Sequence, residues 1–528
     1  MKIKSILLFL ALIGFSSLET ISQNIRISEA RNSLDPYPNE PSIMMDPENP
    51  NILVAGSNIN SYYQSTDSGE TWIENELTSS IGVWGDPVID VDNLGNFYFF
   101  HLSNPPSGEG EWYDRIVCQK SSDNGSSWSD GTFTGLNGTK DQDKPWSVID
   151  RNNNNIYLTW TQFDKLWSSD PSDISIILFS RSLDGGNTWS TPIRINKFEG
   201  DCKDDGNSVI GAMPAVGPNG EIYVSWHSPN GIMFNRSLDQ GNTWLPEEIL
   251  ISTVPGGHIF NITGINRAFL LPVIKCDLSS GTNNGAIYVN WNDQRNGTDN
   301  TDVWLSKSTD GGNNWTSPSR VNNDSTITHQ FFPWMDIDQT NGNLHFVFYD
   351  RRNYTSHYTD VFLAYSGDGG ETFTNRKISE SPFLPNSGIF FGDYNNITVH
   401  NNIVRPVWTR LHIGELSIWT DITPFDSTLS TNDEIASLNT QNIKQYPNPV
   451  SKNTSYVSFK LHESSVIKLE IFDQQGRLIN TIINNDEMGY GKHIIPINLD
   501  ELNLQSGIYY HKLSINGKSK TLKTIIIK

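Results

Sequence analysis

The chain has 528 residues and a formal net charge of −22, with 37 Lys and Arg residues against 59 Asp and Glu residues. This charge, without any basic stretch, excludes the usual electrostatics of nucleic-acid binding. Aromatic residues make up 11% of the chain and glycines number 41, a composition typical of a turn-rich, all-β protein. The cysteines, Cys118, Cys202 and Cys276, are too few for a disulfide scaffold and lack metal-site spacing. The fold must therefore depend on strand packing.

Residues 1–23 have the pattern of a secretory signal peptide. Lys2 and Lys4 precede an apolar run from Ile6 to Phe15, and small and polar residues follow it. The run is too short to cross a bilayer, and no later segment is long enough. We therefore expect an exported chain without a transmembrane segment, the alternative being a buried N-terminal helix.

Residues 24–422 are expected to form one repeat domain, because an eight-residue motif occurs six times at spacings of 56, 61, 55, 71 and 58 residues. Each copy has an Asp suited to capping backbone N–H groups and a Gly suited to positive φ, which predicts a tight turn between two strands. The copies are Ser65–Trp72, Ser121–Trp128, Ser182–Trp189, Ser237–Trp244, Ser308–Trp315 and Ser366–Phe373. They resemble the Asp-box (BNR repeat) of sialidase-like proteins, which implies an all-β, Asp-box β-propeller.

A seventh unit without the motif follows, with strands expected over Tyr394–Val399, Val404–Trp408 and Leu416–Ile422. Its missing outer strand is found at the other end of the chain, where Ile25-Arg-Ile-Ser-Glu resembles the strands that follow the motifs. Pairing this N-terminal strand with the last unit would close the ring and remove two exposed sheet edges. We therefore predict seven blades rather than six.

Residues 423–444 are polar and unpatterned and are predicted to be a linker. Residues 445–528 contain alternating strands together with Tyr446-Pro-Asn-Pro449 and Gly507-Ile-Tyr-Tyr510. This segment resembles the C-terminal sorting domain (type A) of the type IX secretion system and is expected to be a small β-sandwich. The resemblance implies export by that machinery, with the protein released or held at the outer-membrane cell surface. An ordinary sugar-binding β-sandwich is the alternative.

In a four-stranded blade, the first strand begins on the face where the second strand ends, and the Asp-boxes lie on the opposite face. Functional side chains are therefore expected at the entries to the first strands and in the loops after the second strands. The polar residues predicted there are Glu40, Asp86, His101, Lys144, Gln162, Asp164, His227, Asp293, Arg295, Asp350, Arg351, Arg352, Asp393, Tyr394, Arg410 and His412.

The resemblance to sialidases implies roles for several of these residues. Tyr394 would be the nucleophile, a neutral group suited to an anionic substrate, with Glu40, Asp86 and Asp350 as its acid or base partners. The substrate would be bound by Arg295, Arg351, Arg352, Arg410, Lys144, Asp393, His227 and His412, the arginines contacting its carboxylate. Two features depart from the sialidase pattern: Asn39-Glu40-Pro41-Ser42 replaces the Arg-Ile-Pro signature, and seven units replace six.

The preferred prediction is a secreted or surface-held, monomeric glycoside hydrolase, similar to exo-sialidases, acting on anionic glycans. A polysaccharide lyase is the second hypothesis, with His101, His227, His412 or Tyr394 as base and Arg352 neutralising a uronate. The third is a propeller that binds a glycan or protein without turnover. None of these requires a cofactor. Ca²⁺ is an optional ligand of the acidic stretches 201–205 and 299–302, whose spacing fits solvated turns better than a calcium loop.

Overall fold

A computed structural model describes residues 24–31, 38–106, 110–423, 443–450, 453–461, 465–474, 476–489, 491–499, 502, 504–515 and 518–527. The expected signal peptide and all but the ends of the expected linker lie outside these residues. The described residues form strands, turns and loops, without a helix. The chain divides into two compact units, Met1–Phe425 and Asp426–Lys528.

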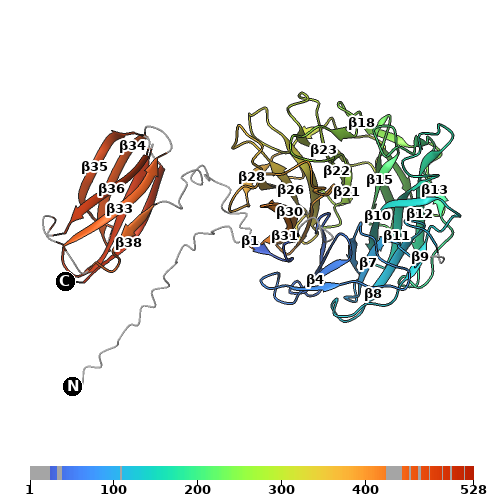
Figure 1. The fold of residues 1–528 in the computed structure, drawn as a ribbon, viewed down its shortest axis with the longest axis horizontal. Helices are drawn as coiled ribbons and strands as arrows, with labels where there is room; N and C mark the ends of the chain where they lie inside the picture. Colours follow the sequence, from blue (N-terminus) through green and yellow to red (C-terminus); the bar gives the residue numbers. More distant parts are fainter. Residues whose placement is uncertain are drawn as a thin grey trace, which may run out of the picture. The chain divides into compact units, whose positions relative to one another are not determined.

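The larger unit is a β-propeller of seven antiparallel sheets (Figure 1). Their first strands contact one another in sequence around a ring. The first blade consists of β2 (Ser42–Met45), β3 (Leu53–Ser57), β4 (Ser61–Ser65) and β5 (Ile73–Glu76), the second of β6 (Val88–Val91), β7 (Phe97–Leu102), β8 (Ile116–Ser121) and β9 (Thr132–Thr134), and the third of β10 (Asp141–Asp150), β11 (Asn155–Phe163), β12 (Ile174–Ser182) and β13 (Ile193–Arg194), with β14 (Gly200–Asp201) added to β12. The fourth blade consists of β15 (Ile210–Val216), β16 (Ile222–Ser228), β17 (Gly231–Ser237) and β18 (Ile249–Ser252), and the fifth of β21 (Val273–Cys276), β22 (Ile287–Asp293), β23 (Asp302–Ser308) and β24 (Ser319–Arg320). The sixth blade consists of β25 (Gln330–Asp338), β26 (Asn343–Asp350), β27 (Asp360–Ser366) and β28 (Thr374–Lys377), and the seventh of β29 (Asn396–His400), β30 (Ile403–His412) and β31 (Glu415–Asp421) with β1 (Asn24–Arg26).

The last blade takes its outer strand from the start of the described chain. β1 pairs antiparallel with β31, so that Ile25 lies opposite Thr420, and Ile27 continues the contact by donating its N–H to the Ile418 carbonyl at 2.8 Å. The prediction of seven blades closed by the N-terminal strand is confirmed, and the six-blade alternative is wrong.

The six repeated motifs connect the third and fourth strands of their blades. In the first copy the Ser65 hydroxyl donates to Asp67 Oδ1 at 2.8 Å, and the N–H of Gly69, at φ 88°, donates to Ser65 Oγ at 2.9 Å. Hydrogen bonds from Thr188 lower the pKa of Asp184 in the third copy to about 2. The Asp carboxylate is therefore hydrogen-bonded within its own turn.

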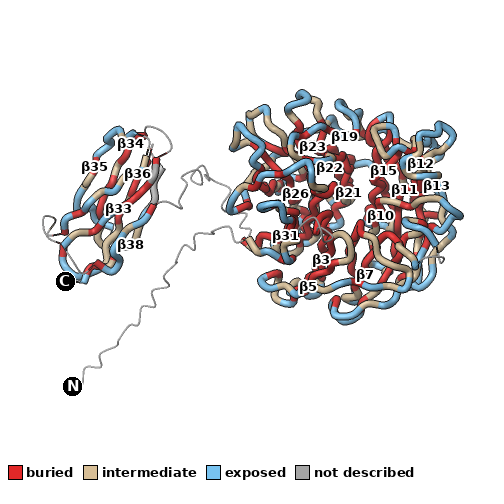
Figure 2. Tube along the Cα trace, viewed as in Figure 1, coloured by how far each residue is buried: buried red, intermediate tan, exposed pale blue. Residues whose placement is uncertain are grey.

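Large apolar side chains repeat at one position of the second strands. Trp160, Trp226, Trp291 and Trp408 are fully buried there. Figure 2 shows buried residues concentrated in the inner strands and exposed residues in the peripheral loops. The fold thus rests on packing between blades. The three cysteines are buried and unpaired.

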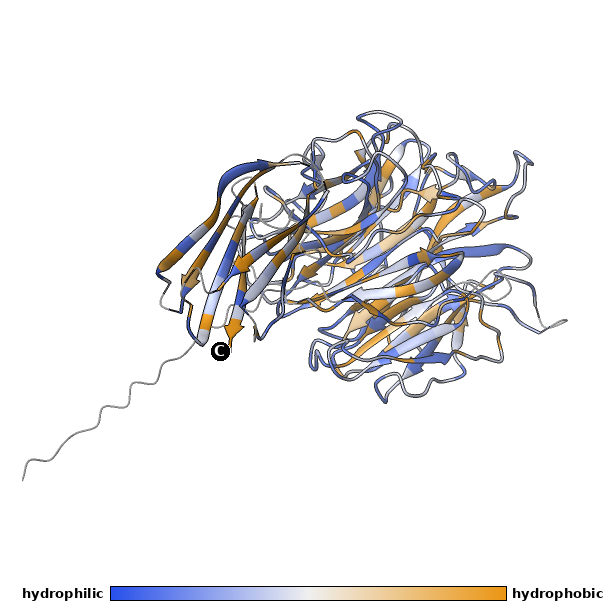
Figure 3. Cartoon of the chain, turned by 60° about the vertical axis from the view of Figure 1, so that its left-hand side comes forward, coloured by the Kyte–Doolittle hydropathy of each residue, from blue (hydrophilic) through white to orange (hydrophobic). Residues whose placement is uncertain are grey.

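The smaller unit is a β-sandwich of two sheets. Buried side chains such as Val457, Leu469 and Leu513 form its core. Apolar and polar residues alternate along its strands (Figure 3). One sheet contains β32 (Lys444–Tyr446), β33 (Thr454–Leu461) and β36 (Gly491–Asn498), and the other contains β35 (Leu478–Met488), β34 (Ser465–Asp473), β37 (Gly507–Ile515) and β38 (Lys518–Ile526).

Candidate functional site

The entries to the first three blades share an uncommon backbone conformation. Glu40, Asp86 and Lys144 each precede a proline and have φ of 50°, 50° and 48°. Left-handed φ costs energy for residues other than glycine and persists only where the surroundings support it. Here the surroundings are polar, because the three side chains meet.

Lys144 is the centre of this cluster. Its Nζ lies 2.9 Å from Asp86 Oδ1, 3.1 Å from Glu40 Oε1 and 3.2 Å from Asp393 Oδ2. Asn58 donates a further hydrogen bond to Glu40 at 2.5 Å. One ammonium group thus joins side chains of the first, second, third and seventh blades, and all four residues are buried. We call Glu40, Asp86, Lys144 and Asp393 the axial cluster.

The carboxyl groups of the axial cluster differ in pKa. Burial raises the pKa of Glu40 well above its usual value, and the Asp86 and Asp393 charges oppose the lowering effect of Lys144. Burial also acts on Asp86 and Asp393. There, however, the neighbouring cations, Lys144 for Asp86 and Arg267 with Lys144 for Asp393, bring the pKa below its usual value. The charged form is therefore favoured at Asp86 and Asp393, and the neutral form is favoured at Glu40.

An insertion between the fourth and fifth blades adds a second cation. Its hairpin, β19 (Ile259–Phe260) with β20 (Ala268–Phe269), leads into Arg267. The guanidinium of Arg267 contacts both carboxylate oxygens of Asp393 and lies 2.7 Å from Asp204 Oδ2. The hairpin is thereby fixed to the seventh blade and to the loop before the fourth.

Two carboxyl groups next to the axial cluster have raised pKa values. Burial and the adjacent Asp86 charge raise the pKa of Asp143 well above its usual value, and Asp143 is hydrogen-bonded to Asp86 and partly exposed. Burial raises the pKa of Asp204 to about 6 despite its contact with Arg267. Asp204 Oδ1 has no hydrogen-bond partner among the described residues. We call Asp143 and Asp204 the mouth carboxyls.

An aromatic platform lies beside Asp143. The rings of Trp84 and Trp112 are 4.5 Å apart between centroids, and Trp84 Nε1 donates to the Tyr113 hydroxyl at 2.8 Å. Burial and the Asp143 charge raise the pKa of Tyr113 to about 12. Trp112 is 49% exposed, and Trp167 in the next blade is 65% exposed. Exposed tryptophans on loops are typical of ligand contact.

The structure contradicts the expected role of Tyr394 as an accessible nucleophile. Tyr394 is 3% exposed, and its ring packs against Trp146 and Trp334 at centroid distances of 5.1 and 5.8 Å. Burial raises the pKa of its hydroxyl well above the usual value. Tyr394 therefore fills the inside of the ring instead of facing a substrate.

Asp350, Arg352 and Arg295 form ion pairs within their own loops, and the expected substrate-binding roles of the two arginines stay predictions. Asp350 is fully buried and bonds Arg352 at 2.6 Å, while Asp293 makes the equivalent contact with Arg295 at 2.5 Å in the preceding blade. Each guanidinium also stacks on an aromatic ring of its own blade. The two Asp-x-Arg sequences thus clamp equivalent loops.

The histidines expected to act on substrate are mostly buried. His227 is 2% exposed and stacks on His258 at 4.2 Å, and burial lowers its pKa to about 4. His101 is fully buried between the Leu102 carbonyl and Gln119. Neither has access to a substrate proton.

The remaining predicted residues lie apart from the axial cluster. Arg410 donates to Ser381 at 2.7 Å and lines, with His412, a cavity of about 250 Å³ that also contains the carboxylates of Glu380 and Glu415. Arg351 lines a different cavity. The structure therefore brings Glu40, Asp86, Lys144 and Asp393 together, as a buried group, and does not gather the four predicted arginines around one substrate.

Residues 444–528 match the family described as the secretion system C-terminal sorting domain. The smaller unit is a sorting domain. It indicates type IX secretion to the cell surface or into the medium, as predicted. A comparison with curated proteins found no match. Among the described residues, no helix is both long enough and apolar enough to cross a membrane.

Solved structures similar to the chain include three proteins with enzyme names. The NanB sialidase of Streptococcus pneumoniae is 9% identical over 70% of this chain and 83% of its own, with a TM-score of 0.43. An ulvan polysaccharide lyase is 12% identical over 75% and 95%, with a TM-score of 0.47. The α-L-arabinanase of Penicillium chrysogenum is 13% identical over 76% and 98%, with a TM-score of 0.40. Values this low assign no activity, and the strand order of the sheets defines the fold.

The acidic stretches considered for Ca²⁺ have other contacts. Asp204 bonds Arg267, and Asp302 accepts a hydrogen bond from Asn322 at 2.7 Å. Within the part of the chain that the structure describes, no three His, Cys, Asp or Glu side chains are grouped to hold a metal ion. Calcium binding stays a prediction.

Proposed function

We propose that the exported propeller is a glycoside hydrolase acting on acidic glycans, and that its reaction takes place at the mouth carboxyls. The observation that carries the proposal is the raised pKa of both Asp143 and Asp204, with the aromatic platform beside Asp143. Neighbouring titratable groups with strongly perturbed pKa values are typical of acid–base catalysis.

Hydrolysis of a glycosidic bond needs a proton donor for the leaving oxygen and a second carboxylate as base or nucleophile. Asp143 suits the first role, because burial and the adjacent Asp86 charge raise its pKa, which favours the protonated form. Lys144 in turn keeps Asp86 ionised. The axial cluster therefore acts as a positioning group for the acid instead of contacting substrate.

Asp204 suits the second role. With a pKa of about 6 it is mostly ionised at neutral pH, and Arg267 stabilises the charged form. Its Oδ1, a buried atom without a hydrogen-bond partner among the described residues, would be the atom that accepts a proton or attacks the sugar carbon. Trp112 would hold the apolar face of a sugar ring, since pyranose C–H groups stack on indole rings.

The proposal is tested with Asp143→Asn, which preserves shape but cannot donate the proton. On a panel of sialylated, uronate-containing and sulfated glycans, the wild-type chain should release new reducing ends. Loss of the general acid should lower kcat by about 10²–10⁴-fold with little change in substrate affinity. Absence of product from every glycan with the wild-type chain would refute the hydrolase.

Binding without turnover is the second candidate, and the burial of the axial cluster favours it. Glu40, Asp86, Lys144 and Asp393 tie four blades together, which is also what a purely structural ion network would do. In that case glycans should bind to the wild-type chain and to Asp143→Asn equally, and neither should release product. The lyase hypothesis has less support, because His101 and His227 are buried, Tyr394 fills the ring and His412 lies apart from the axial cluster beside Arg410.

A further inference from the structure

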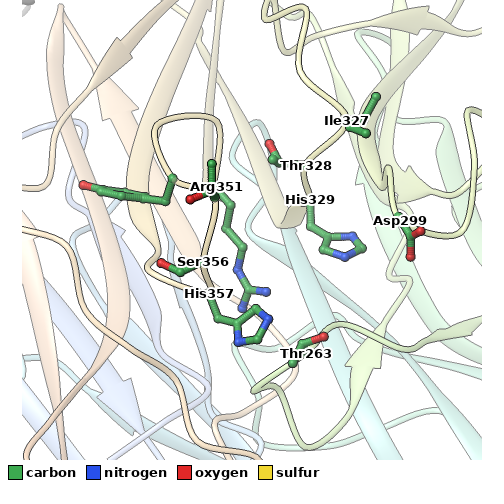
Figure 4. A pocket seen from close by; sticks show the side chains of 10 residues that line it. Thr263, Asp299, Ile327, Thr328, His329, Arg351, Ser356 and His357 are labelled. Atoms are coloured by element: carbon green, nitrogen blue, oxygen red, sulfur yellow. The ribbon is translucent and has the colours of Figure 1, made fainter. Parts of the chain in front are cut away.

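A cavity of about 180 Å³ lies on the same face as the mouth carboxyls, between loops of the fifth and sixth blades. Figure 4 shows the guanidinium of Arg351 pointing into the space between His329, His357 and Thr263. Thr263 belongs to the insertion whose Arg267 contacts Asp204, so one segment reaches both the cavity and a mouth carboxyl.

Arg351 is buried without a counter-ion. It is 3% exposed, its Nε donates to Thr359 Oγ1 at 3.1 Å, and its Nη2 has no hydrogen-bond partner in the described protein. Burial lowers its pKa to about 10, so it remains a cation at neutral pH, and no carboxylate acts on it. Its neighbour Arg352, by contrast, bonds Asp350.

The other titratable groups of the cavity do not neutralise Arg351. Nδ1 of His329 is hydrogen-bonded to the Thr301 hydroxyl at 3.0 Å. Burial together with the Arg351 charge lowers the pKa of His329 to about 4. It is therefore neutral at pH 7. Asp299 lines the rim but is exposed, so solvent screens its charge.

A buried, unpaired guanidinium is costly, and proteins usually pair such a group or use it to bind a ligand. Arginine presents two parallel N–H groups that match the oxygens of a carboxylate or a sulfate ester. The cavity has room for several water molecules, and so for an oxyanion with part of a sugar ring.

We propose that the Arg351 cavity is a subsite for the carboxylate or sulfate ester of an acidic saccharide. That the anion belongs to a saccharide rests on the proposed function, whereas the preference for an oxyanion rests on Arg351 itself. The net charge of −22 repels anions from the chain as a whole, so binding would depend on this local cation.

The test is direct binding of glucuronate, glucose 6-sulfate, glucose and inorganic sulfate to the full chain, by titration calorimetry. The matched variants are Arg351→Met and Arg194→Met. Arg194 is exposed and paired with Glu199 at 2.8 Å on the outer strand of the third blade, so its replacement removes the same charge elsewhere.

The wild-type chain and Arg194→Met should bind both anionic sugars at least tenfold more tightly than glucose, and Arg351→Met should lose that preference. Arg351→Met should also keep or raise the melting temperature of the unliganded chain, because it removes an unpaired buried charge. A purely structural Arg351 would instead lower it.

Equal affinity for glucuronate and glucose, or anion binding retained in Arg351→Met, would overturn the inference. Binding of inorganic sulfate without either anionic sugar would overturn the saccharide assignment. Turnover is not measured, so a chain that binds glucuronate through Arg351 but releases no product upholds the subsite and refutes only the hydrolase.

Discussion

Replacing Lys144 with Met should destabilise the propeller strongly, because three buried carboxyl groups share this one ammonium. Arg267 would still pair with Asp393, and burial raises the pKa of Glu40, which favours its neutral form. The uncompensated charge is therefore that of Asp86, and leaving one buried charge unpaired costs about 3–5 kcal/mol. We expect the free energy of unfolding at pH 7 to fall by this amount.

The loss should depend on pH. In the wild-type chain Asp86 has a lowered pKa, so its stabilising effect is present above the unfolded pKa and is lost as the pH falls through the folded pKa. In Lys144→Met the folded pKa of Asp86 should rise above the unfolded value, so that ionisation destabilises the fold as pH increases. The difference between the two chains should therefore be small near pH 4 and grow towards pH 7.

Urea unfolding followed by tryptophan fluorescence measures this difference. All 16 tryptophans lie between Trp72 and Trp419, so the signal reports the propeller and not the sorting domain. Lys275→Met is the control, because Lys275 forms a more exposed pair with Asp336 at 3.2 Å and should cost at most about 1 kcal/mol. A loss below about 1 kcal/mol for Lys144→Met, or one independent of pH, would refute the ion-pair argument.

Three further outcomes are expected. In the folded chain the pKa values of His101 and His227 are about 4, so both stay neutral until the pH falls to about that value. Unfolded histidines take up protons below about pH 6.5. As the pH falls from 6.5 to 4, the free energy of unfolding should therefore drop by about 3 kcal/mol for each of the two histidines. Replacing them by Asn or Gln should make the melting temperature depend less on pH in this acid range. Asp184→Ala should cost about 1–2 kcal/mol by urea unfolding without changing glycan affinity, as for loss of a capping side chain; lost affinity would place function on the motif face. Trp112→Ala should weaken glycan binding about tenfold or more at unchanged melting temperature, and unaltered affinity would exclude the platform.

The blades were predictable because their strands carry a local signal. Each unit repeats a Pro-opened first strand, a β-branched and aromatic second strand and a turn motif, and these preferences do not depend on distant contacts. The insertion with Arg267 also left a trace, since the fourth interval between motifs is 71 residues instead of 55 to 61. The longer interval predicts an insertion but does not predict which blades the inserted residues contact.

The sequence predicted which face of the propeller carries the site, but not how the residues on that face are arranged. Glu40, Asp86, Lys144 and Asp393 do meet, as their places at the strand entries suggested, but their burial depends on how four blades pack. Asp143 stands next to Lys144 in the chain. Its role as the partly exposed neighbour follows from a bulge between Asp143 and Trp146 that the sequence pattern does not predict.

A repeat in the sequence indicates the structural role of two of the predicted arginines. Asp293-Gln-Arg295 and Asp350-Arg-Arg352 occupy the same position in successive blades, and a feature repeated with the fold is typical of a structural clamp. Arg351, which lies between Asp350 and Arg352, is not part of this repeat. Its lack of an acidic partner is a property of the packed loops, and only the structure reveals it.

The most direct test of the central claim is the release of reducing ends from acidic glycans by the wild-type chain and by Asp143→Asn, measured side by side at neutral pH. The account predicts product from at least one acidic glycan with the wild-type chain, and a loss of about 10²–10⁴-fold in Asp143→Asn with glycan binding retained. Equal rates in the two chains, or no product from any glycan, would contradict it.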